Sequence, residues 1–274
     1  MSTRRHHSKA PLTTLLLSLI ILITIFIFYF FDKHSESQSN ASLSMSVDNI
    51  IETSSIEPDY IKSADNEYSI SSLDMNNYPD SFRLDIPYIS QYPELPTGCE
   101  ITSLAEVLHY LGYSIDKETL ARDYLDMKDK ATNGCFVEYF WGSPWKASGS
   151  GCFAPAIANA ANSFFKANGA LHSAYIMSYQ PPEMLYAQLS KGHPVIVWTC
   201  FDYSVKEIKY NEVVLDDGTV FTWPRNEHCV ALAGYDINKR TVTLADPTYG
   251  IVERDMDKFE DYYKRYYYQA VVIE

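Results

Sequence analysis

The chain has 274 residues, of which 46% are hydrophobic, and its formal net charge at pH 7 is −13. An acidic protein of this kind repels the phosphate backbone, so nucleic acid is excluded as a main partner. None of the five cysteines has the C-x-x-C spacing of a zinc site, and no motif implies a metal or an organic cofactor.

The first feature along the chain is an apolar segment at 12–31, which contains 20 residues without a charge. A helix of this length spans about 30 Å, the thickness of a bilayer core. Arg4, Arg5 and Lys9 precede the segment, so the positive-inside rule places 1–11 in the cytoplasm and the rest outside. A cleaved signal peptide is the alternative, but the sequence "FFDKHSESQS" offers no A-x-A-like cleavage site. We therefore predict a single transmembrane anchor.

Residues 32–79 form the next segment, with 12 serines, nine acidic residues and two lysines, and without apolar periodicity. This composition predicts a disordered, Ser-rich acidic stalk, which as a flexible coil would reach about 40 Å. The remaining residues, 80–274, are numerous enough for one domain with its own hydrophobic core.

This domain begins with a predicted helix at 98–111, where apolar residues repeat at helical spacing and Gly112 occupies the C′ position. Thr97 and Glu100 have the T-x-x-E form of a capping box. The helix therefore holds Cys99 in its first turn, where the positive end of the helix dipole stabilises a thiolate.

The other predicted elements give the fold class. Helices are expected at 116–127, 154–168 and 181–191, the last two opening with proline and ending before glycine. The second half reads as strands, in the segments "PVIVWTCF", "HCVALAGYD", "RTVTLADP" and "YYQAVVIE". Helices followed by an antiparallel sheet indicate an α+β domain.

Two of these strands predict a spatial neighbourhood. The segment "DINK" between them carries turn residues, so we expect a tight hairpin centred near Ile237. Pairing about this centre places His228 opposite Asp246, with Cβ atoms about 4.5–5.5 Å apart on one face.

The odd number of cysteines has a redox interpretation if the domain lies outside the cell. Two disulfides and one free thiol are then expected, with Cys99 as the free thiol. Pairing of Cys135 with Cys152 would close a Gly- and Ser-rich loop, and pairing of Cys200 with Cys229 would join two strands. The alternative is that some of these cysteines are small buried hydrophobic residues.

Residue types and their order suggest a nucleophilic site. A catalytic thiol needs a base, a group that orients the base, and donors for an oxyanion. Cys99, His228 and Asp246 can fill the first three roles, and Gln91 can donate to the oxyanion together with the backbone N–H of Cys99. The order Gln, Cys, His, Asp is that of papain-like peptidases. The aromatic and glycine-rich segment "FVEYFWGSPWKASGSG" suggests a loop that lines the cleft, or one anchored to the core by its tryptophans.

Several motifs together resemble a bacterial peptidase family related to the double-glycine leader peptidases: "IPYISQYPELPTGCE", "GSGCFAPAI", "KGHPVIVW", "HCVALAGYD" and "LADPTYG". The resemblance covers 83–273 and keeps the motifs in order. It implies a papain-like fold, with Cys99 as nucleophile, His228 as general base, Asp246 as orienting acid and Gln91 in the oxyanion hole.

We therefore expect a membrane-anchored, extracytoplasmic cysteine peptidase-like hydrolase with a Cys-His-Asp triad, acting on a peptide substrate. Two alternatives remain from the sequence. One is a cell-wall amidase or endopeptidase that acts on peptidoglycan stem peptides, and the other is a non-catalytic peptide-binding module of the same fold. The oligomeric state is not indicated by the sequence.

Overall fold

The computed structural model describes residues 78–129, 135–215 and 218–274, except the side chains of 135 and 136. The predicted anchor at 12–31 and all but the last two residues of the predicted stalk lie outside this part. Within the described ranges, no helix has both the length and the apolar character needed to cross a membrane.

The end of the predicted stalk belongs to the folded domain. The Tyr78 ring packs edge-on against Tyr235, with ring centroids 5.7 Å apart, and also contacts Tyr186. The Tyr235 hydroxyl donates a hydrogen bond of 2.9 Å to the carbonyl oxygen of Pro79. The folded domain therefore includes Tyr78 and Pro79, which precede the predicted boundary at residue 80.

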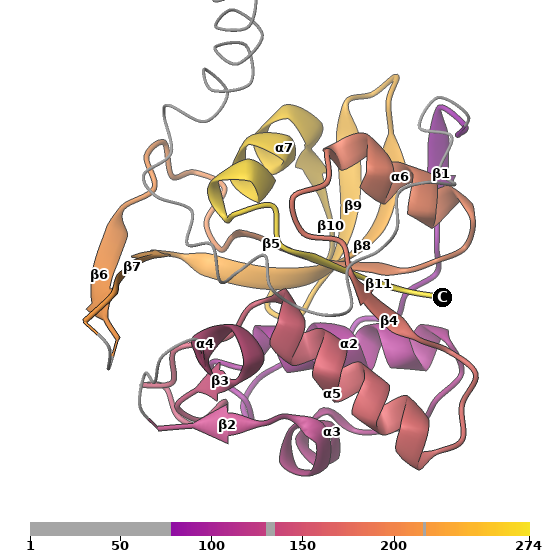
Figure 1. Cartoon of the computed structure of the whole chain (residues 1–274). Helices are drawn as coiled ribbons and strands as arrows, with labels where there is room; N and C mark the ends of the chain where they lie inside the picture. The colour runs from indigo at the N-terminus through magenta and orange to yellow at the C-terminus, as the bar shows by residue number, and fades with distance from the viewer. Residues whose placement is uncertain (1–77, 130–134, 216–217) are drawn as a thin grey trace, which may run out of the picture. The chain divides into compact units, whose positions relative to one another are not determined.

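A seven-stranded antiparallel sheet forms the centre of the domain (Figure 1). Its main path runs in the order β10 (Gly250–Asp255), β9 (Thr241–Asp246), β8 (Glu227–Asp236), β5 (Val195–Cys200), β11 (Ala270–Ile273) and β4 (Ala174–Ile176). The seventh strand, β1 (Ser81–Arg83), pairs with β8. All residues of β5 and β11 are buried, because helices cover the centre of the sheet on both faces.

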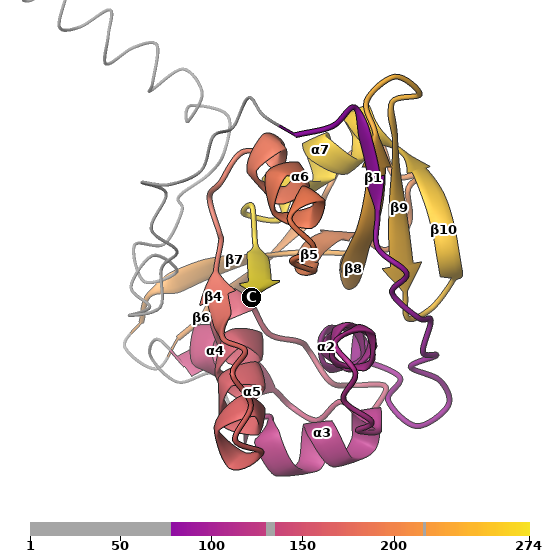
Figure 2. The same ribbon diagram turned by 90° about the vertical axis from the view of Figure 1, so that its right-hand side faces the viewer.

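The helices form two groups, one on each face of the sheet (Figures 1 and 2). The first group is α2 (Cys99–Tyr110), α3 (Lys117–Tyr124), α4 (Cys135–Glu138) and α5 (Ala154–Ala167). The second group is α6 (Pro182–Ser190) and α7 (Met256–Arg265). Helix α2 packs against β8 with ten consecutive buried residues, from Cys99 to Leu108.

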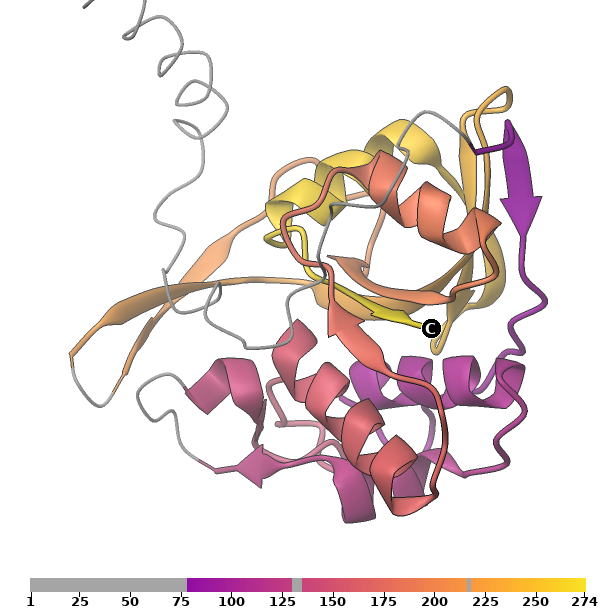
Figure 3. The same cartoon turned by 45° about the vertical axis from the view of Figure 1, so that its right-hand side comes forward.

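Two smaller sheets extend the domain beside the first helix group. Strands β2 (Met127–Lys128) and β3 (Phe140–Trp141) form a parallel pair. Strands β6 (Tyr210–Val214) and β7 (Val220–Pro224) form an antiparallel hairpin that projects from the body of the domain (Figure 3). We call this hairpin the β6–β7 arm, and it leads directly into β8.

The predicted α+β arrangement is confirmed in outline. The four predicted helices correspond to α2, α3, α5 and α6, and the four predicted strands correspond to β5, β8, β9 and β11. The second half also contains α7, which the sequence analysis did not predict. Its buried residues include Phe259, Tyr262 and Tyr263, so the tyrosine-rich segment serves to pack this helix on the sheet.

The predicted capping box is wrong. Gly98 is the N-cap of α2, and no side chain caps the helix there. The Thr97 hydroxyl instead donates to the carbonyl oxygens of Ser143 and Lys146, at 3.4 and 3.0 Å. The Thr97 hydroxyl therefore hydrogen-bonds to the long loop after β3 and not, as the sequence pattern predicts, to the first turn of the helix.

The register of the β8–β9 hairpin also differs from the prediction. Asp236 pairs with Thr241, which is three residues out of the predicted register, and a bulge between Leu232 and Gly234 reduces this difference to two residues. Beyond the bulge Ala231 lies opposite Ala245, so the predicted direct pairing of His228 with Asp246 does not occur. The error is two residues in total, which keeps both side chains on the same face because strand side chains alternate with a period of two.

The predicted disulfides are wrong for the cysteines whose side chains the structure describes. Cys99, Cys152, Cys200 and Cys229 are all free and buried. Cys229 lies opposite Trp198 in the β5–β8 pair, whereas Cys200 lies opposite Glu227. Cys152, Cys200 and Cys229 therefore act as small core residues, which was the alternative interpretation, whereas Cys99 is free as predicted.

Candidate functional site

The position of Cys99 follows from how α2 meets the sheet. Gly98 ends the preceding turn, and alanine there would bring its Cβ within 2.9 Å of the Leu95 Cβ atom. One turn into the helix, the Ser103 hydroxyl donates a hydrogen bond of 3.1 Å to the Cys229 carbonyl oxygen of β8. This packing fixes the N-terminus of α2, and Cys99 with it, beside the start of β8.

His228 and Asp246 form a buried hydrogen-bonded pair. The distance from His228 Nε2 to Asp246 Oδ1 is 2.8 Å, and the two residues are only 2% and 3% exposed. The predicted contact is therefore confirmed, although the pairing that led to it was wrong. With Nε2 engaged, Nδ1 is the ring nitrogen available to accept a proton.

The loop after β9 holds Asp246 in its ionised form. Burial raises the pKa of Asp246, but the His228 ring and the N–H groups of Thr248 and Tyr249 outweigh it and lower the pKa below the ordinary value. Both N–H groups donate to Oδ1, at 2.8 and 3.2 Å. The carboxylate is thus ready to support a positive charge on the imidazole.

Gln91 lies on the same side of the domain as this pair, next to the β9–β10 turn. Its Nε2 donates to the Pro96 carbonyl oxygen at 3.0 Å, and its Oε1 accepts a hydrogen bond of 3.3 Å from the Thr248 hydroxyl. The side chain is 3% exposed. Gln91 therefore links the turn before α2 to the loop of Asp246, and it makes no hydrogen bond to Cys99.

The surroundings of Cys99 differ from the expectation of a stabilised thiolate. Its Sγ donates to Glu100 Oε2 at 3.3 Å, and no hydrogen bond joins it to His228. Burial raises the pKa of the Cys99 thiol well above its usual value, and the nearby Glu100, Glu227 and Cys229 add to the increase. The predicted stabilisation of a Cys99 thiolate is therefore wrong for this arrangement, which favours the protonated thiol.

Two carboxyl groups near Cys99 were not identified from the sequence. Glu100 is fully buried, and its Oε1 accepts a hydrogen bond of 2.8 Å from the backbone N–H of Cys152. Burial raises the pKa of Glu100 to about 6, and burial together with Glu100 raises the pKa of Glu227 well above its usual value. The Cys99, Glu100 and Glu227 ligand atoms lie within 4.8 Å of one another, so the group can share a proton or hold a small cation.

Sequence signals for these two residues existed but were ambiguous. Glu100 is an acidic residue at the start of an otherwise apolar helix. A capping box would also explain an acidic residue at this position. Glu227 directly precedes His228, but it lies close to α2 only because β8 packs against that helix. No sequence motif encodes this packing.

The chain matches the Peptidase_C39 like family over residues 83–271. The uncharacterized protein YvpB of Bacillus subtilis (strain 168) is 32% identical over 188 residues, which cover 66% of this chain and 71% of YvpB. A crystal structure from Bacillus anthracis, provisionally described as a C39-like peptidase, superposes with a TM-score of 0.62 at 28% identity. That alignment covers 71% of this chain and 97% of the other.

These likenesses agree with the family that the motifs suggested and with the mixed arrangement of helices and sheet. The family match also extends over the whole segment that carries Cys99, His228 and Asp246. The chain therefore belongs to the Peptidase_C39 like family.

Proposed function

We propose that this protein is a cysteine peptidase-like hydrolase, with Cys99 as nucleophile, His228 as general base and Asp246 as orienting acid. The observation that carries the proposal is the buried His228–Asp246 pair, which lies at the contact of α2 with β8, where α2 presents Cys99. Membership of a C39-like family supports the reaction class.

The proposed reaction is acyl transfer to a thiol. The Cys99 side chain must first rotate away from Glu100, so that its S–H group faces Nδ1 of His228. The ring takes the proton as sulfur forms a bond to the carbonyl carbon, and then gives that proton to the departing amine. Water subsequently attacks the thioester, with the same ring as base, and releases the acid and the free thiol.

Gln91 is proposed to help stabilise the oxyanion together with the Cys99 N–H. An amide nitrogen carries two hydrogens, and Gln91 Nε2 uses one of them for the Pro96 carbonyl oxygen. The second hydrogen is the one that would serve the oxyanion.

The location proposed from the sequence is extracytoplasmic, with the protein held in the membrane by 12–31. The support for it is the uncharged apolar run and the Arg4, Arg5 and Lys9 cluster before it. A domain in that position would meet exported peptides or the stem peptides of the cell wall.

One observation favours the non-catalytic alternative, in which the domain binds peptides without turnover. In the structure the Cys99 thiol donates a hydrogen bond to the Glu100 carboxyl group and not to the His228 imidazole, and the pKa of the thiol is raised. The experiment must therefore distinguish turnover from binding.

The test is to incubate the full-length protein with a peptide library and with purified cell wall, and to follow cleavage by mass spectrometry. Cys99→Ser should abolish cleavage, while Asp246→Asn should lower kcat by about 10²–10⁴-fold because it weakens support for the protonated ring. Cys200→Ala removes a buried thiol outside the site and is the matched control. Cleavage that survives Cys99→Ser would refute the proposed nucleophile, and peptide binding without any cleavage would favour the binding module.

A further inference from the structure

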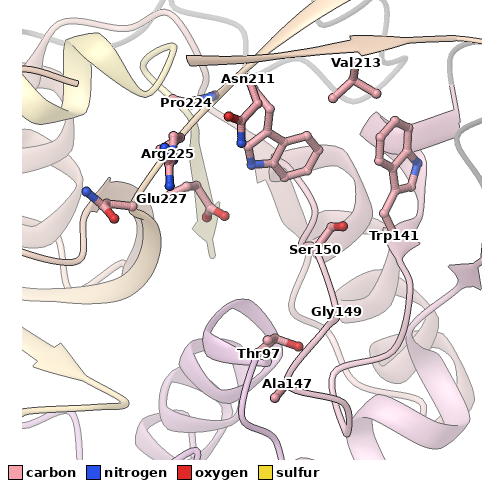
Figure 4. A pocket seen from close by; sticks show the side chains of 12 residues that line it. Thr97, Trp141, Ala147, Gly149, Ser150, Asn211, Val213, Pro224, Arg225 and Glu227 are labelled. Carbon is pink, nitrogen blue, oxygen red and sulfur yellow. The ribbon is translucent and has the colours of Figure 1, made fainter. Parts of the chain in front are cut away.

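A cavity of about 870 Å³ lies beside the candidate site, between the β6–β7 arm and the loop after β3 (Figure 4). Thr97 and Ala147 are on the opposite side of it from Pro224 and Arg225. Glu227 lines the cavity and also lies within 4.8 Å of Cys99 Sγ. A ligand group in this cavity could therefore contact Glu227, which in turn lies next to the candidate nucleophile.

Glu227 lines the cavity and carries a carboxyl oxygen without a hydrogen-bond partner in the described part of the chain. Its Oε1 atom is buried and has no hydrogen-bond partner among the described residues. The carboxyls of Glu227 and Glu100 converge on Gly151, where an added Cβ would lie 3.1 and 2.8 Å from their oxygens. Glu100 accepts hydrogen bonds from the Cys152 N–H and the Cys99 thiol, so the unsatisfied atom of this pair is Oε1 of Glu227, which is unusual for a buried carboxyl group.

The cationic residues of the domain do not supply that partner. No salt bridge within the described ranges involves Glu100 or Glu227. Arg225 lines the same cavity but is exposed and forms no ion pair with Glu227. His228 lowers the pKa of Glu100 through its charge, yet its own hydrogen bond goes to Asp246.

Aromatic side chains provide another wall of the cavity. Trp141 and Trp223 both line it and stack on each other, with ring centroids 5.6 Å apart and an interplanar angle of 28°. Indole faces attract ammonium and guanidinium groups and also cover the apolar stem of a long basic side chain.

We propose that this cavity is a specificity subsite for a basic side chain of the substrate, such as lysine or arginine, next to the scissile bond. Glu227 is the residue that recognises the positive charge of this side chain. The inference rests on the proposed peptidase function and adds a substrate class to it. The volume lies within the range of about 300–1,000 Å³ that is usual for ligand sites. A cation at this position would give the buried carboxyl pair its missing counter-charge and would favour the ionised form of Glu227.

The first arm of the test uses sets of three peptides that carry lysine, norleucine or glutamate at one position around the cleavage site. Norleucine keeps the apolar stem of lysine and removes only the charged group. We expect the wild type to cleave the lysine peptide with a kcat/KM about tenfold or more above that of the norleucine peptide at one position. Glu227→Gln should reduce that ratio to about one, whereas Glu212→Gln, an exposed residue on the β6–β7 arm, should leave it unchanged.

The second arm does not depend on turnover. The rate of Cys99 modification is compared for aminoethyl methanethiosulfonate, which is cationic, and for the neutral ethyl reagent, with peptide mapping to identify the thiol. A preference for the cationic reagent that Glu227→Gln removes would support the subsite even if no peptide is cleaved and the peptidase proposal fails. Peptide cleavage without a lysine preference at any position, or equal modification rates in the wild type, would overturn the subsite and leave the peptidase proposal intact.

Discussion

At the scale of single residues, the main result is a competition between two electrostatic effects on Cys99. A helix N-terminus stabilises a negative charge by about 0.3–2 kcal/mol. A carboxylate about 4 Å from a thiolate opposes it by about 4 kcal/mol at an effective dielectric constant of 20. Burial is the largest cause that raises the pKa of the Cys99 thiol, and Glu100 and Glu227 raise it further, so the combined effect opposes the helix N-terminus and favours the protonated thiol.

This competition predicts the effect of Glu100→Gln. The amide still accepts the hydrogen bond from the Cys152 N–H, but it removes the charge nearest to Cys99. The pKa of the thiol should therefore fall, and its pH–rate profile for alkylation by iodoacetamide should move to lower pH. At pH 8 we expect alkylation to be faster by up to about tenfold, because a tenfold change corresponds to one pKa unit.

Glu94→Gln is a suitable control for this measurement. Glu94 is also an acidic residue close in sequence to Cys99, but its carboxylate is partly exposed and pairs with Lys117 at 2.8 Å. An unchanged profile in Glu100→Gln would mean that the Glu100 carboxyl does not act on the thiol in solution.

The residue types of the candidate site were predictable, and part of its environment was not. The order of Gln91, Cys99, His228 and Asp246 follows the pattern of papain-like peptidases, and the structure places His228 against Asp246. Their catalytic roles stay predictions. The raised pKa of Cys99 could not be predicted, because its largest cause is the burial of the thiol in the folded domain, and because Glu227 reaches it only through the packing of β8 on α2.

At the scale of elements, the β8–β9 hairpin shows how an incorrect register can still predict a correct contact, here the one between His228 and Asp246. The turn "DINK" was identified, but its centre lies further along the chain than predicted, and the bulge near Gly234 offsets only one residue of the resulting register difference. Gly234 is needed there because a Cβ atom would come within 2.8 Å of the Phe82 carbonyl oxygen of β1. That contact is made by a strand distant in sequence, so no local pattern indicates it.

Two of the strands that the sequence did not reveal share a physical cause. Strand β10 alternates between exposed and half-buried positions and β6 is exposed at all but one position, so neither buries an apolar face. Helix α7 is a different case, because Met256, Phe259 and Tyr263 are buried at helical spacing and this signal was overlooked. Periodicity detects elements that bury a continuous apolar face, and it identified β5, β8 and α5 for that reason.

The loop between β3 and α5 gives a prediction at this scale. A Cβ atom on Gly149 would lie 2.3 Å from the Thr97 hydroxyl oxygen and 2.5 Å from the Ser143 carbonyl oxygen. Gly149→Ala should therefore displace the loop that forms one wall of the cavity, with a loss of about 1–3 kcal/mol in the free energy of unfolding. Thermal and chemical denaturation measure this loss.

Ser148→Ala is the matched control, because Ser148 is exposed and adjacent to Gly149 in the chain. It should change the free energy of unfolding by less than about 0.5 kcal/mol. If both variants unfold like the wild type, the loop is not held against Thr97 in the way the structure indicates.

At the scale of the whole molecule, the chain combines a C39-like domain with a long N-terminal region of different composition. The family match begins at residue 83, and the described fold begins at Tyr78. The acidic, Ser-rich segment before it carries none of the candidate site residues. Its proposed role as a stalk would place the cavity and Cys99 at a distance from the membrane, where peptides outside the cell can reach them.

The last prediction concerns this anchoring. Residues 12–31 provide 20 uncharged, mostly apolar residues, enough to span a bilayer core of about 30 Å. Full-length protein should therefore sediment with membranes and remain there after washing at high salt and at alkaline pH, because burial in lipid does not depend on ionic contacts. A variant lacking residues 1–31 should appear in the soluble fraction.

Protease added to intact spheroplasts should degrade the C-terminal domain, since the basic residues before the segment orient the chain outward. Recovery of a secreted form that starts near residues 35–45 would show instead that the segment is a cleaved signal peptide, and protection of the domain from protease would reverse the proposed orientation.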